Sequence, residues 1–259
     1  MRLLDRVRWF PGARELIVQA RAEMPQKDEL CGAFVAVVSL RAYGIEISDQ
    51  DEAAAAAGIR LLAGGTPEGR PPGEKIRDDY RISLPRTQNA AEAGASSAGV
   101  AHAIEVLSAG RLRAVPACGD WTSARLGELL TALYDLRWVA PVANVDTAEL
   151  GAFDTPATAL ADYLDGGLPP FWSSRWHTGH FTLLTGVATG EGGALVSVMD
   201  SYPSLGDRGL HLQLLDRLAL ALRRERLGRP GGVLLTVPEA DAERAAGLIT
   251  RAGLRVGLW

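Results

Sequence analysis

The sequence predicts an α+β fold, with helices concentrated in its first half and antiparallel strands in its second half. Two patterns support this prediction. The first half holds apolar residues at helical spacing in segments that end at Pro or Gly, and the second half holds β-rich runs separated by a glycine-rich turn. The chain of 259 residues is 47% hydrophobic and 22% charged, so it is long enough to bury a sizeable core.

Helical patterns dominate the first half of the chain. Segment 31–43 is nearly all apolar and ends before Gly44, so its length favours a buried helix over a strand. The Gly- and Pro-rich segment 63–75 predicts a loop. In chain order, we expect helices over residues 12–24 and 31–43, a capped helix from Ser48, helices over 96–109, 123–136 and 155–164, and strands over 111–117 and 139–145.

The second half is predicted to hold a hairpin and a closing unit of two strands and a helix. The hairpin strands are residues 181–187 and 194–199, and a leucine-rich helix follows over 212–227. The chain then predicts a strand over 233–237, a helix over 240–251 and a strand over 254–258. We therefore expect one domain over residues 1–230 and a C-terminal extension, residues 231–259, packed on it.

Charge and hydropathy argue against several classes of protein. Lys and Arg total 27 against 31 Asp and Glu, and the resulting net charge of −4 lacks the basic footprint of a nucleic-acid-binding protein. No apolar stretch approaches the roughly 18 residues of a membrane span. The first residues lack the apolar core of a signal peptide, so we expect a cytoplasmic location. The composition is typical of GC-rich bacterial coding, and it indicates no oligomeric state.

Cys31 is the first candidate catalytic residue, since it stands at the predicted start of the buried helix. The dipole and unpaired amides of a helix N-terminus stabilise an anion, which lowers a thiol pKa and increases the thiolate fraction. Gly32 removes side-chain bulk beside the sulfur. The chain has two cysteines and four histidines, which are too few for a disulfide scaffold. Their spacing fits no zinc site, and we predict neither a metal nor a cofactor.

The hairpin supplies a base and an acid for that thiol. His180 precedes its first strand and Asp200 follows its second, at equal distances from a turn centred on residue 190. Antiparallel pairing therefore predicts that the two side chains are cross-strand neighbours. A carboxylate beside an imidazole fixes its tautomer and stabilises the imidazolium, so Cys31, His180 and Asp200 form a nucleophile, base and orienting acid. Gln26 and the Cys31 backbone amide are candidate oxyanion donors.

The remaining Cys and His residues are given lesser roles. His177 is the rival base, and its place in the loop before the strand favours a position at the rim of the site. Cys118 is expected to be structural, and a reduced cytoplasm argues against the alternative of a Cys31–Cys118 disulfide. His102 is expected at the surface and His211 at the entry to a helix.

Two further groups of side chains have alternative interpretations. The aromatic residues before His180 either line a substrate cleft or pack normally; they are Phe171, Trp172 and Trp176. Four arginines gather at a predicted helix C-terminus, which the helix dipole favours; they are Arg223, Arg224, Arg226 and Arg229. We interpret these arginines as a solvated helix end.

The candidate site residues, in this order, resemble the papain-like cysteine peptidases. The motifs are Gln26, Cys31-Gly32-Ala33, Tyr43-Gly44 after the buried helix, Gly179-His180-Phe181 and Asp200. They are most similar to the bacteriocin-processing branch, which cleaves leader peptides after a double glycine. The similarity covers residues 24–205, and the long segment between the Cys and His motifs indicates a divergent, stand-alone member. It implies a papain-like fold, in which a helical N-terminal half carries Cys31 and a C-terminal antiparallel sheet carries His180 and Asp200.

The expected function is that of a cysteine peptidase acting on a peptide, such as a leader peptide, through a thioester acyl-enzyme. The resemblance implies that Cys31 is the nucleophile, His180 the base and Asp200 its orienting acid, and that Gln26 is the oxyanion donor. Papain-like folds also host acyltransferases that use an amine or a carrier thiol in place of water. A non-catalytic peptide-binding relative is the third possibility.

Overall fold

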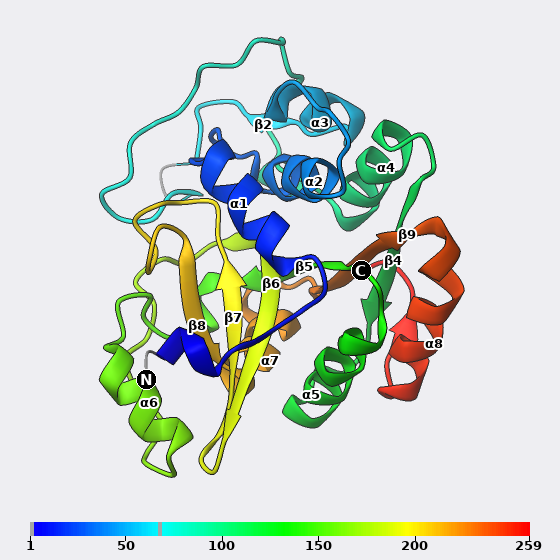
Figure 1. The fold of residues 1–259 in the computed structure, drawn as a ribbon. Helices are drawn as coiled ribbons and strands as arrows, with labels where there is room; N and C mark the ends of the chain where they lie inside the picture. Colours follow the sequence, from blue (N-terminus) through cyan, green and yellow to red (C-terminus); the bar gives the residue numbers. More distant parts are fainter. Residues whose placement is uncertain (1–2, 67–68) are drawn as a thin grey trace.

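An antiparallel sheet lies between two layers of helices in the computed structural model, which describes residues 3–66 and 69–259 (Figure 1). The strand order is β10-β4-β9-β5-β6-β7-β8, and β1 pairs with β6. Its strands are β1 (Arg8–Trp9), β4 (Leu112–Cys118), β5 (Ala140–Asp146), β6 (Gly179–Gly190), β7 (Gly193–Met199), β8 (Leu210–Leu214), β9 (Gly232–Pro238) and β10 (Arg255–Val256). A small separate sheet pairs β2 (Leu61–Leu62) with β3 (Arg86–Thr87). The predicted α+β class is confirmed.

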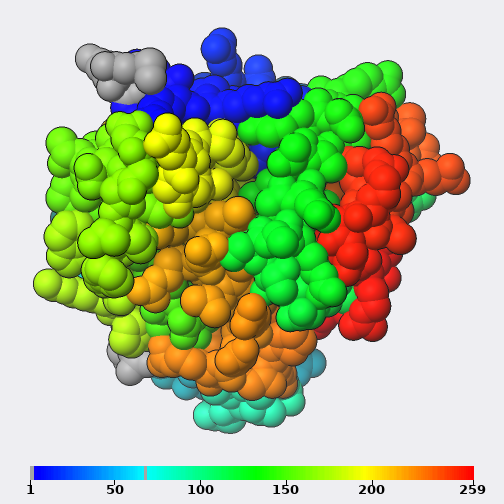
Figure 2. Space-filling view, turned by 90° about the horizontal axis from the view of Figure 1, so that it is seen from below, coloured from blue at the N-terminus to red at the C-terminus, as the bar shows by residue number. Residues whose placement is uncertain are grey.

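Eight α-helices occur in the described ranges, and most of them cover the two faces of this sheet. One layer consists of α1 (Ala13–Glu23), α2 (Cys31–Ala42), α3 (Gln50–Ala56) and α4 (Ser97–Leu107). The other consists of α5 (Ser123–Ala132), α7 (Leu215–Arg223) and α8 (Ala242–Arg251), and Figure 2 shows it from outside, with α6 (Ala157–Leu164) to one side. Short 3-10 helices span Leu3–Arg6, Ala90–Glu92, Leu133–Asp135, Thr147–Glu149, Glu225–Leu227 and Glu239–Asp241.

The sheet separates two hydrophobic cores because successive side chains of a strand point to opposite faces. In β9, Val233 and Leu235 join the core beneath α5, α7 and α8, whereas Leu234 joins the core beneath α1 to α4. Burial of one Val or Leu side chain contributes about 1.5–3 kcal/mol. Strands buried on both faces therefore anchor both helical layers.

Helix α2 begins and ends close to the predicted positions. All residues from Gly32 to Leu40 are buried, which explains why the segment is apolar on every side. A Cβ atom on residue 32 would collide with Ala95 and with Val100 of α4, so only glycine allows α2 to approach α4 this closely. Gly44, with a φ of 82°, then follows the helix in the left-handed region.

The predicted helix over 212–227 is wrong at its start. Residues Leu210–Leu214 form strand β8, and α7 begins only at Leu215. The sequence Leu-His-Leu-Gln-Leu alternates apolar and polar residues with a period of two, which is the strand pattern. His211 is consequently a buried strand residue and not the helix-entry residue we expected.

The C-terminal segment forms a strand, a helix and a strand in the predicted order, but it is not an extension packed on a finished domain. β9 lies between β4 and β5 and pairs with both along most of its length. Residues 231–259 therefore complete the central sheet and contribute to its cores, so a boundary at residue 230 would cut through one folded unit.

The hairpin register differs from the predicted one. Gly190 pairs with Gly193, and an irregularity between Leu184 and Gly186 shifts the pairing, so that Leu183 lies opposite Met199. His180 and Asp200 are therefore not directly opposite one another along the ladder. Side chains two positions out of register on one face still lie within reach, and these two do contact each other, as described below.

Candidate active site

The loop before Cys31 is anchored by a buried ion network. Lys27 is fully buried, and its Nζ lies 2.9 Å from Asp49 Oδ1 and 2.9 Å from Asp51 Oδ1. The backbone N–H of Lys27 also donates to Gln50 Oε1 over 2.8 Å. These partners belong to the start of α3, so the network fixes the loop against that helix. The position of Cys31 at the first turn of α2 follows from this anchor.

His180 and Asp200 form the sheet side of the site. Nε2 of His180 lies 2.9 Å from Oδ1 of Asp200, and both side chains are buried. The N–H of Ser201 donates to the same oxygen over 2.7 Å. Burial alone would raise the pKa of Asp200, but the charge and hydrogen bond of His180 outweigh it and hold that pKa well below its usual range. Asp200 is therefore an anion that orients the imidazole.

The Cys31 thiol joins this pair from α2. It is hydrogen-bonded to His180, whose Nδ1 is left for the sulfur because Nε2 faces Asp200. Burial alone would raise the pKa of the thiol, but His180 and the N–H groups of Phe181 and Gly32 lower it. Burial would lower the pKa of His180, but Asp200 and Cys31 raise it to about 10. The hydrogen bond between Cys31 and His180 thus favours a thiolate beside an imidazolium.

Gln26 is connected to the same network through Ser201. Its Oε1 accepts a hydrogen bond from the Ser201 hydroxyl over 2.6 Å, and its backbone N–H donates to the Ser201 carbonyl over 3.0 Å. Gln26 and Cys31 line the same cavity. Since Ser201 holds the amide oxygen, the Nε2 group is the end of Gln26 that can donate to an oxyanion formed near the sulfur.

His211 is a buried neighbour of Asp200 whose role the sequence patterns did not reveal. Gln213 Nε2 lies 3.1 Å from His211 Nδ1, while Gln213 Oε1 accepts the N–H of Gly151 over 2.8 Å. Nδ1 of His211 is therefore an acceptor, and the proton sits on Nε2. That nitrogen lies 3.7 Å from Asp200 Oδ2, longer than a direct hydrogen bond. The strand pattern of residues 210–214 was the signal that could have placed His211 here.

Trp176 covers the imidazole of His180. Its ring centroid lies 4.6 Å from that of His180 and 5.7 Å from that of Tyr202, and both Trp176 and Tyr202 are buried. An aromatic cover of this kind keeps water away from the bond between His180 and Asp200, which strengthens it. Trp176 thus packs against the catalytic pair, whereas Phe171 and Trp172 are exposed.

A cavity of about 240 Å³ brings Cys31, His180 and Gln26 together. Much of its remaining lining consists of small residues, namely Gly69, Ala90, Ala93, Gly94, Ala95 and Gly179. Glu29, Thr66, Asn144 and Thr178 also contribute to it. These small side chains leave space in the cavity beside the sulfur of Cys31.

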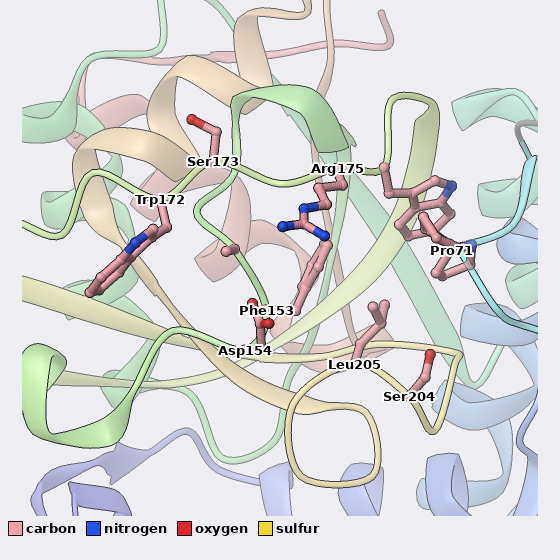
Figure 3. Close-up of a pocket in the computed structure, with 11 residues that line it drawn as sticks. Pro71, Phe153, Asp154, Trp172, Ser173, Arg175, Ser204 and Leu205 are labelled. Atoms are coloured by element: carbon pink, nitrogen blue, oxygen red, sulfur yellow. The ribbon is translucent and has the colours of Figure 1, made fainter.

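A separate cavity of about 350 Å³ has Trp176 in its lining (Figure 3). It is lined by Trp172, Phe153, Arg175 and Leu205 among others, and in Figure 3 the side chain of Arg175 extends over that of Phe153. Trp172 therefore does contribute to the wall of a cleft, although the cleft differs from the one that holds Cys31.

The other sequence-predicted Cys and His residues lie outside the contact network of Cys31. His177 is exposed and its Nε2 faces the carbonyl of Ser174 at 3.2 Å, so it is a rim residue and His180 occupies the position of the base. His102 is exposed on α4. Cys118 is buried at the end of β4, and both cysteines are free thiols.

In residues 3–66 and 69–259, no group of three or more His, Cys, Asp or Glu side chains is arranged to hold a metal ion. Within the same ranges, no helix combines the length and apolarity needed to cross a bilayer.

Comparison with known proteins identifies a family for nearly the whole chain. A model described as a family of unknown function (DUF6885) matches residues 10–259. No curated protein matches the chain. The function therefore has to be inferred from the site.

Proposed function

The chain belongs to the family of unknown function DUF6885, and from its site geometry we propose that it is a papain-like cysteine hydrolase that cleaves a peptide through a thioester acyl-enzyme. One observation carries the proposal. Cys31, His180 and Asp200 form a continuous hydrogen-bonded chain, and Cys31 and His180 open onto the same cavity. A reduced compartment such as the cytoplasm is the proposed setting, because the nucleophile has to remain a free thiol.

The proposed reaction begins with attack of the Cys31 thiolate on the carbonyl carbon of the scissile amide. The developing oxyanion accepts hydrogen bonds from Gln26 Nε2 and from the Cys31 backbone N–H. As the C–N bond breaks, Nδ1 of the His180 imidazolium gives its proton to the leaving amine, and Cys31 keeps the acyl group as a thioester. His180 then takes a proton from water, whose oxygen attacks the thioester and releases the acid and the thiolate.

The proposed fold assignment has the same support. Cys31 starts a buried helix in the N-terminal helical layer, while His180 and Asp200 belong to an antiparallel sheet. The resemblance to papain-like peptidases implies the same arrangement, with the nucleophile on a helix and the base and acid on a sheet. A leader peptide is the proposed type of substrate, since a narrow cavity lined by Gly and Ala favours small residues next to the scissile bond.

Alkylation of Cys31 with iodoacetamide at pH 6, followed by peptide mapping, tests the nucleophile. We expect Cys31 to react much faster than a free cysteine at this pH, and Cys31→Ala to abolish both labelling and peptide cleavage. Cys118→Ala is the matched control, because it removes the other thiol and should leave labelling and cleavage unchanged. Cleavage that persists in Cys31→Ala would overturn the proposal, and a product joined to an added amine would identify acyl transfer in place of hydrolysis.

A further inference from the structure

Arg224 is held in an unusual backbone conformation beside the candidate active site. It follows the last residue of α7 with φ 50° and ψ 37°, which is the left-handed region that normally favours glycine. Non-glycine residues in this region are strained and cluster at functional sites. The strained backbone of Arg224 therefore indicates that its side chain has a role, since glycine would fit the same conformation without strain.

The guanidinium of Arg224 lies against Gly179, the residue before His180. Its Nε is buried and has no hydrogen-bond partner among the described residues. A Cβ atom on Gly179, the residue before His180, would lie 2.5 Å from Arg224 Nη2, so glycine at that position makes room for the guanidinium. Burial lowers the pKa of Arg224, while the negative charges of Cys31 and Asp146 oppose that effect. The arginine is thus close enough for its charge to act on the sulfur.

Further arginines line a cavity of about 700 Å³ that adjoins the one holding Cys31. Gly69 and Thr178 line the cavity of Cys31, and their chain neighbours Arg70 and His177 line the second one. Leu227 also lines the second cavity and lies close to Gly179. The two cavities are therefore neighbours along these segments.

The wall of the adjoining cavity is cationic. It includes Arg70, Arg175 and Arg226, opposed by Glu74 alone among its acidic lining residues. Arg70 is paired with Asp28, whereas no ion pair of Arg175 or Arg226 occurs among the described residues, and both are exposed. Arg226 is thus exposed at the end of α7, as expected for a solvated helix end, and it also lines this cavity.

The direction of the proposed reaction places this basic surface on the leaving-group side. His180 protonates the leaving amine, so the part of the peptide that follows the scissile bond has to pass His180. Gly179 lines the cavity beside His180, and the Arg224 guanidinium lies against Gly179. A guanidinium at this position recognises a carboxylate through paired, charge-assisted hydrogen bonds.

We propose that Arg224, with Arg175 and Arg226, selects peptides that carry a carboxylate shortly after the scissile bond. The carboxylate belongs either to an Asp or Glu side chain or to the C-terminus of a short leaving peptide. This inference rests on the proposed function, because it assigns the specificity of the same site.

The first test compares two alkylating reagents of similar size and different charge, iodoacetate and iodoacetamide. The Arg224 charge should attract the anion, so Arg224→Gly should lower the iodoacetate-to-iodoacetamide rate ratio at Cys31 by roughly three- to tenfold. Glycine suits the left-handed backbone, so this variant should fold at least as well as the wild type. Arg224→Gln should lower the ratio equally, and Arg224→Lys should largely keep it.

Arg208→Gly is the matched control for this experiment. Arg208 also has a left-handed backbone, with φ 48°, but it is exposed and does not lie against Gly179 as Arg224 does. Its substitution removes the same charge and the same strain, so the rate ratio should stay at the wild-type value. A ratio unchanged in both Arg224→Gly and Arg224→Gln would overturn the proposal even if Cys31 remains highly reactive.

The second test uses a pool of tryptic peptides digested with the protein and sequenced by mass spectrometry. We expect wild-type cleavage sites to be enriched in Asp, Glu or a free C-terminus within the next three residues, and Arg224→Gly to lose that enrichment. An amidated copy of the pool distinguishes the C-terminal carboxylate from the side chains. Cleavage without this preference would refute the specificity and leave the hydrolase standing, whereas an unreactive Cys31 would refute the hydrolase itself.

Discussion

Cys31 and Cys118 have similar neighbours in the sequence, but the fold places the two thiols in different surroundings. Each cysteine stands at the end of an element and precedes a glycine, Cys31 at the start of α2 and Cys118 at the end of β4. Cys31 receives a hydrogen bond network from β6 and from Asp200, and it opens onto a cavity. Cys118 is buried at the edge of the sheet, where β4 pairs with β10.

The difference shows that local sequence alone does not make a thiol reactive. A helix N-terminus favours a thiolate, but in this molecule the hydrogen bond and charge of His180 are larger influences on the pKa of Cys31 than the N–H of Gly32. His180 depends in turn on Asp200. Substitutions that remove His180 or Asp200 should therefore make Cys31 behave more like an ordinary cysteine.

The largest expected effect comes from Asp200→Asn. The amide keeps the shape of the carboxylate but no longer stabilises the His180 imidazolium, so turnover should fall by roughly 10²- to 10⁴-fold. Labelling of Cys31 by iodoacetamide at pH 6 should fall in parallel, because fewer molecules hold the thiolate–imidazolium pair. Mass-spectrometric labelling rates check this, and Asp207→Asn, at an exposed carboxylate in the nearby loop, is the control. A labelling rate equal to that of the wild type would contradict the assignment of Asp200.

The second effect concerns the support of the Cys31 loop. Lys27→Met leaves the carboxylate of Asp51 buried without its cation and leaves Asp49 with the exposed Arg81 alone, so the free energy of unfolding should fall by about 3–5 kcal/mol. Urea unfolding followed by circular dichroism measures this loss. Lys75→Met is the matched control at an exposed lysine, where a change within about 0.5 kcal/mol is expected. Equal stability of the two variants would show that the network does not anchor the loop.

The third effect is the pH dependence of the two reactions at Cys31. The lowered thiol pKa should make the loss of alkylation rate between pH 8 and 6 smaller than the roughly 80-fold loss of an ordinary thiol of pKa 8.5. Hydrolysis should also decline as the pH rises through about 10, since His180 then loses the proton that the leaving amine needs. Alkylation needs no proton donor and should show no such decline. Measuring the rates of hydrolysis and of alkylation against pH distinguishes the loss of thiolate at low pH from the loss of the His180 proton at high pH.

The smallest effect is expected from His211→Phe. Phenylalanine retains the edge-to-face packing on Phe153, whose ring centroid lies 4.8 Å from that of His211, but it removes the N–H that faces Asp200. Turnover should fall by roughly two- to tenfold, because Asp200 Oδ2 loses the imidazole N–H that faces it, while His180 and Ser201 still hold Oδ1. His211→Gln, whose NH₂ group reaches a similar position, should restore most of the rate. Indistinguishable rates for the two variants would mean that His211 has no positioning role.

The elements that sequence patterns located best are those specified by their own residues. The apolar residues between Cys31 and Gly44 predict helix α2 on their own, and the glycines of the hairpin predict its turn. The pairing register of the hairpin strands could not be predicted in this way. It depends on the irregularity between Leu184 and Gly186, which no rule based on composition indicates. The predicted pair of His180 and Asp200 nevertheless forms, since both side chains lie on the same face of the hairpin.

The missed features are those that several segments build together. His211 lies beside Asp200 only because β8 pairs with β7. The leucines of β8 resemble those of the following helix, so the sequence predicted one helix over both. The sequence alone places Arg224 at a solvated helix end, because its contact with Gly179 joins two segments that are far apart in the chain. Side chains of this kind are found from tertiary contacts and not from spacing along the chain.

The place of β9 between β4 and β5 also sets an order for synthesis on the ribosome. β4 and β5 each pair with β9 and are separated by it, although β9 follows both of them by many residues. The half of the sheet that carries His180 can therefore join the half that carries β4 only after residue 238 has left the ribosome. A nascent chain stalled before that point would expose two unpaired strand edges, and pairing over so long a separation forms late in folding.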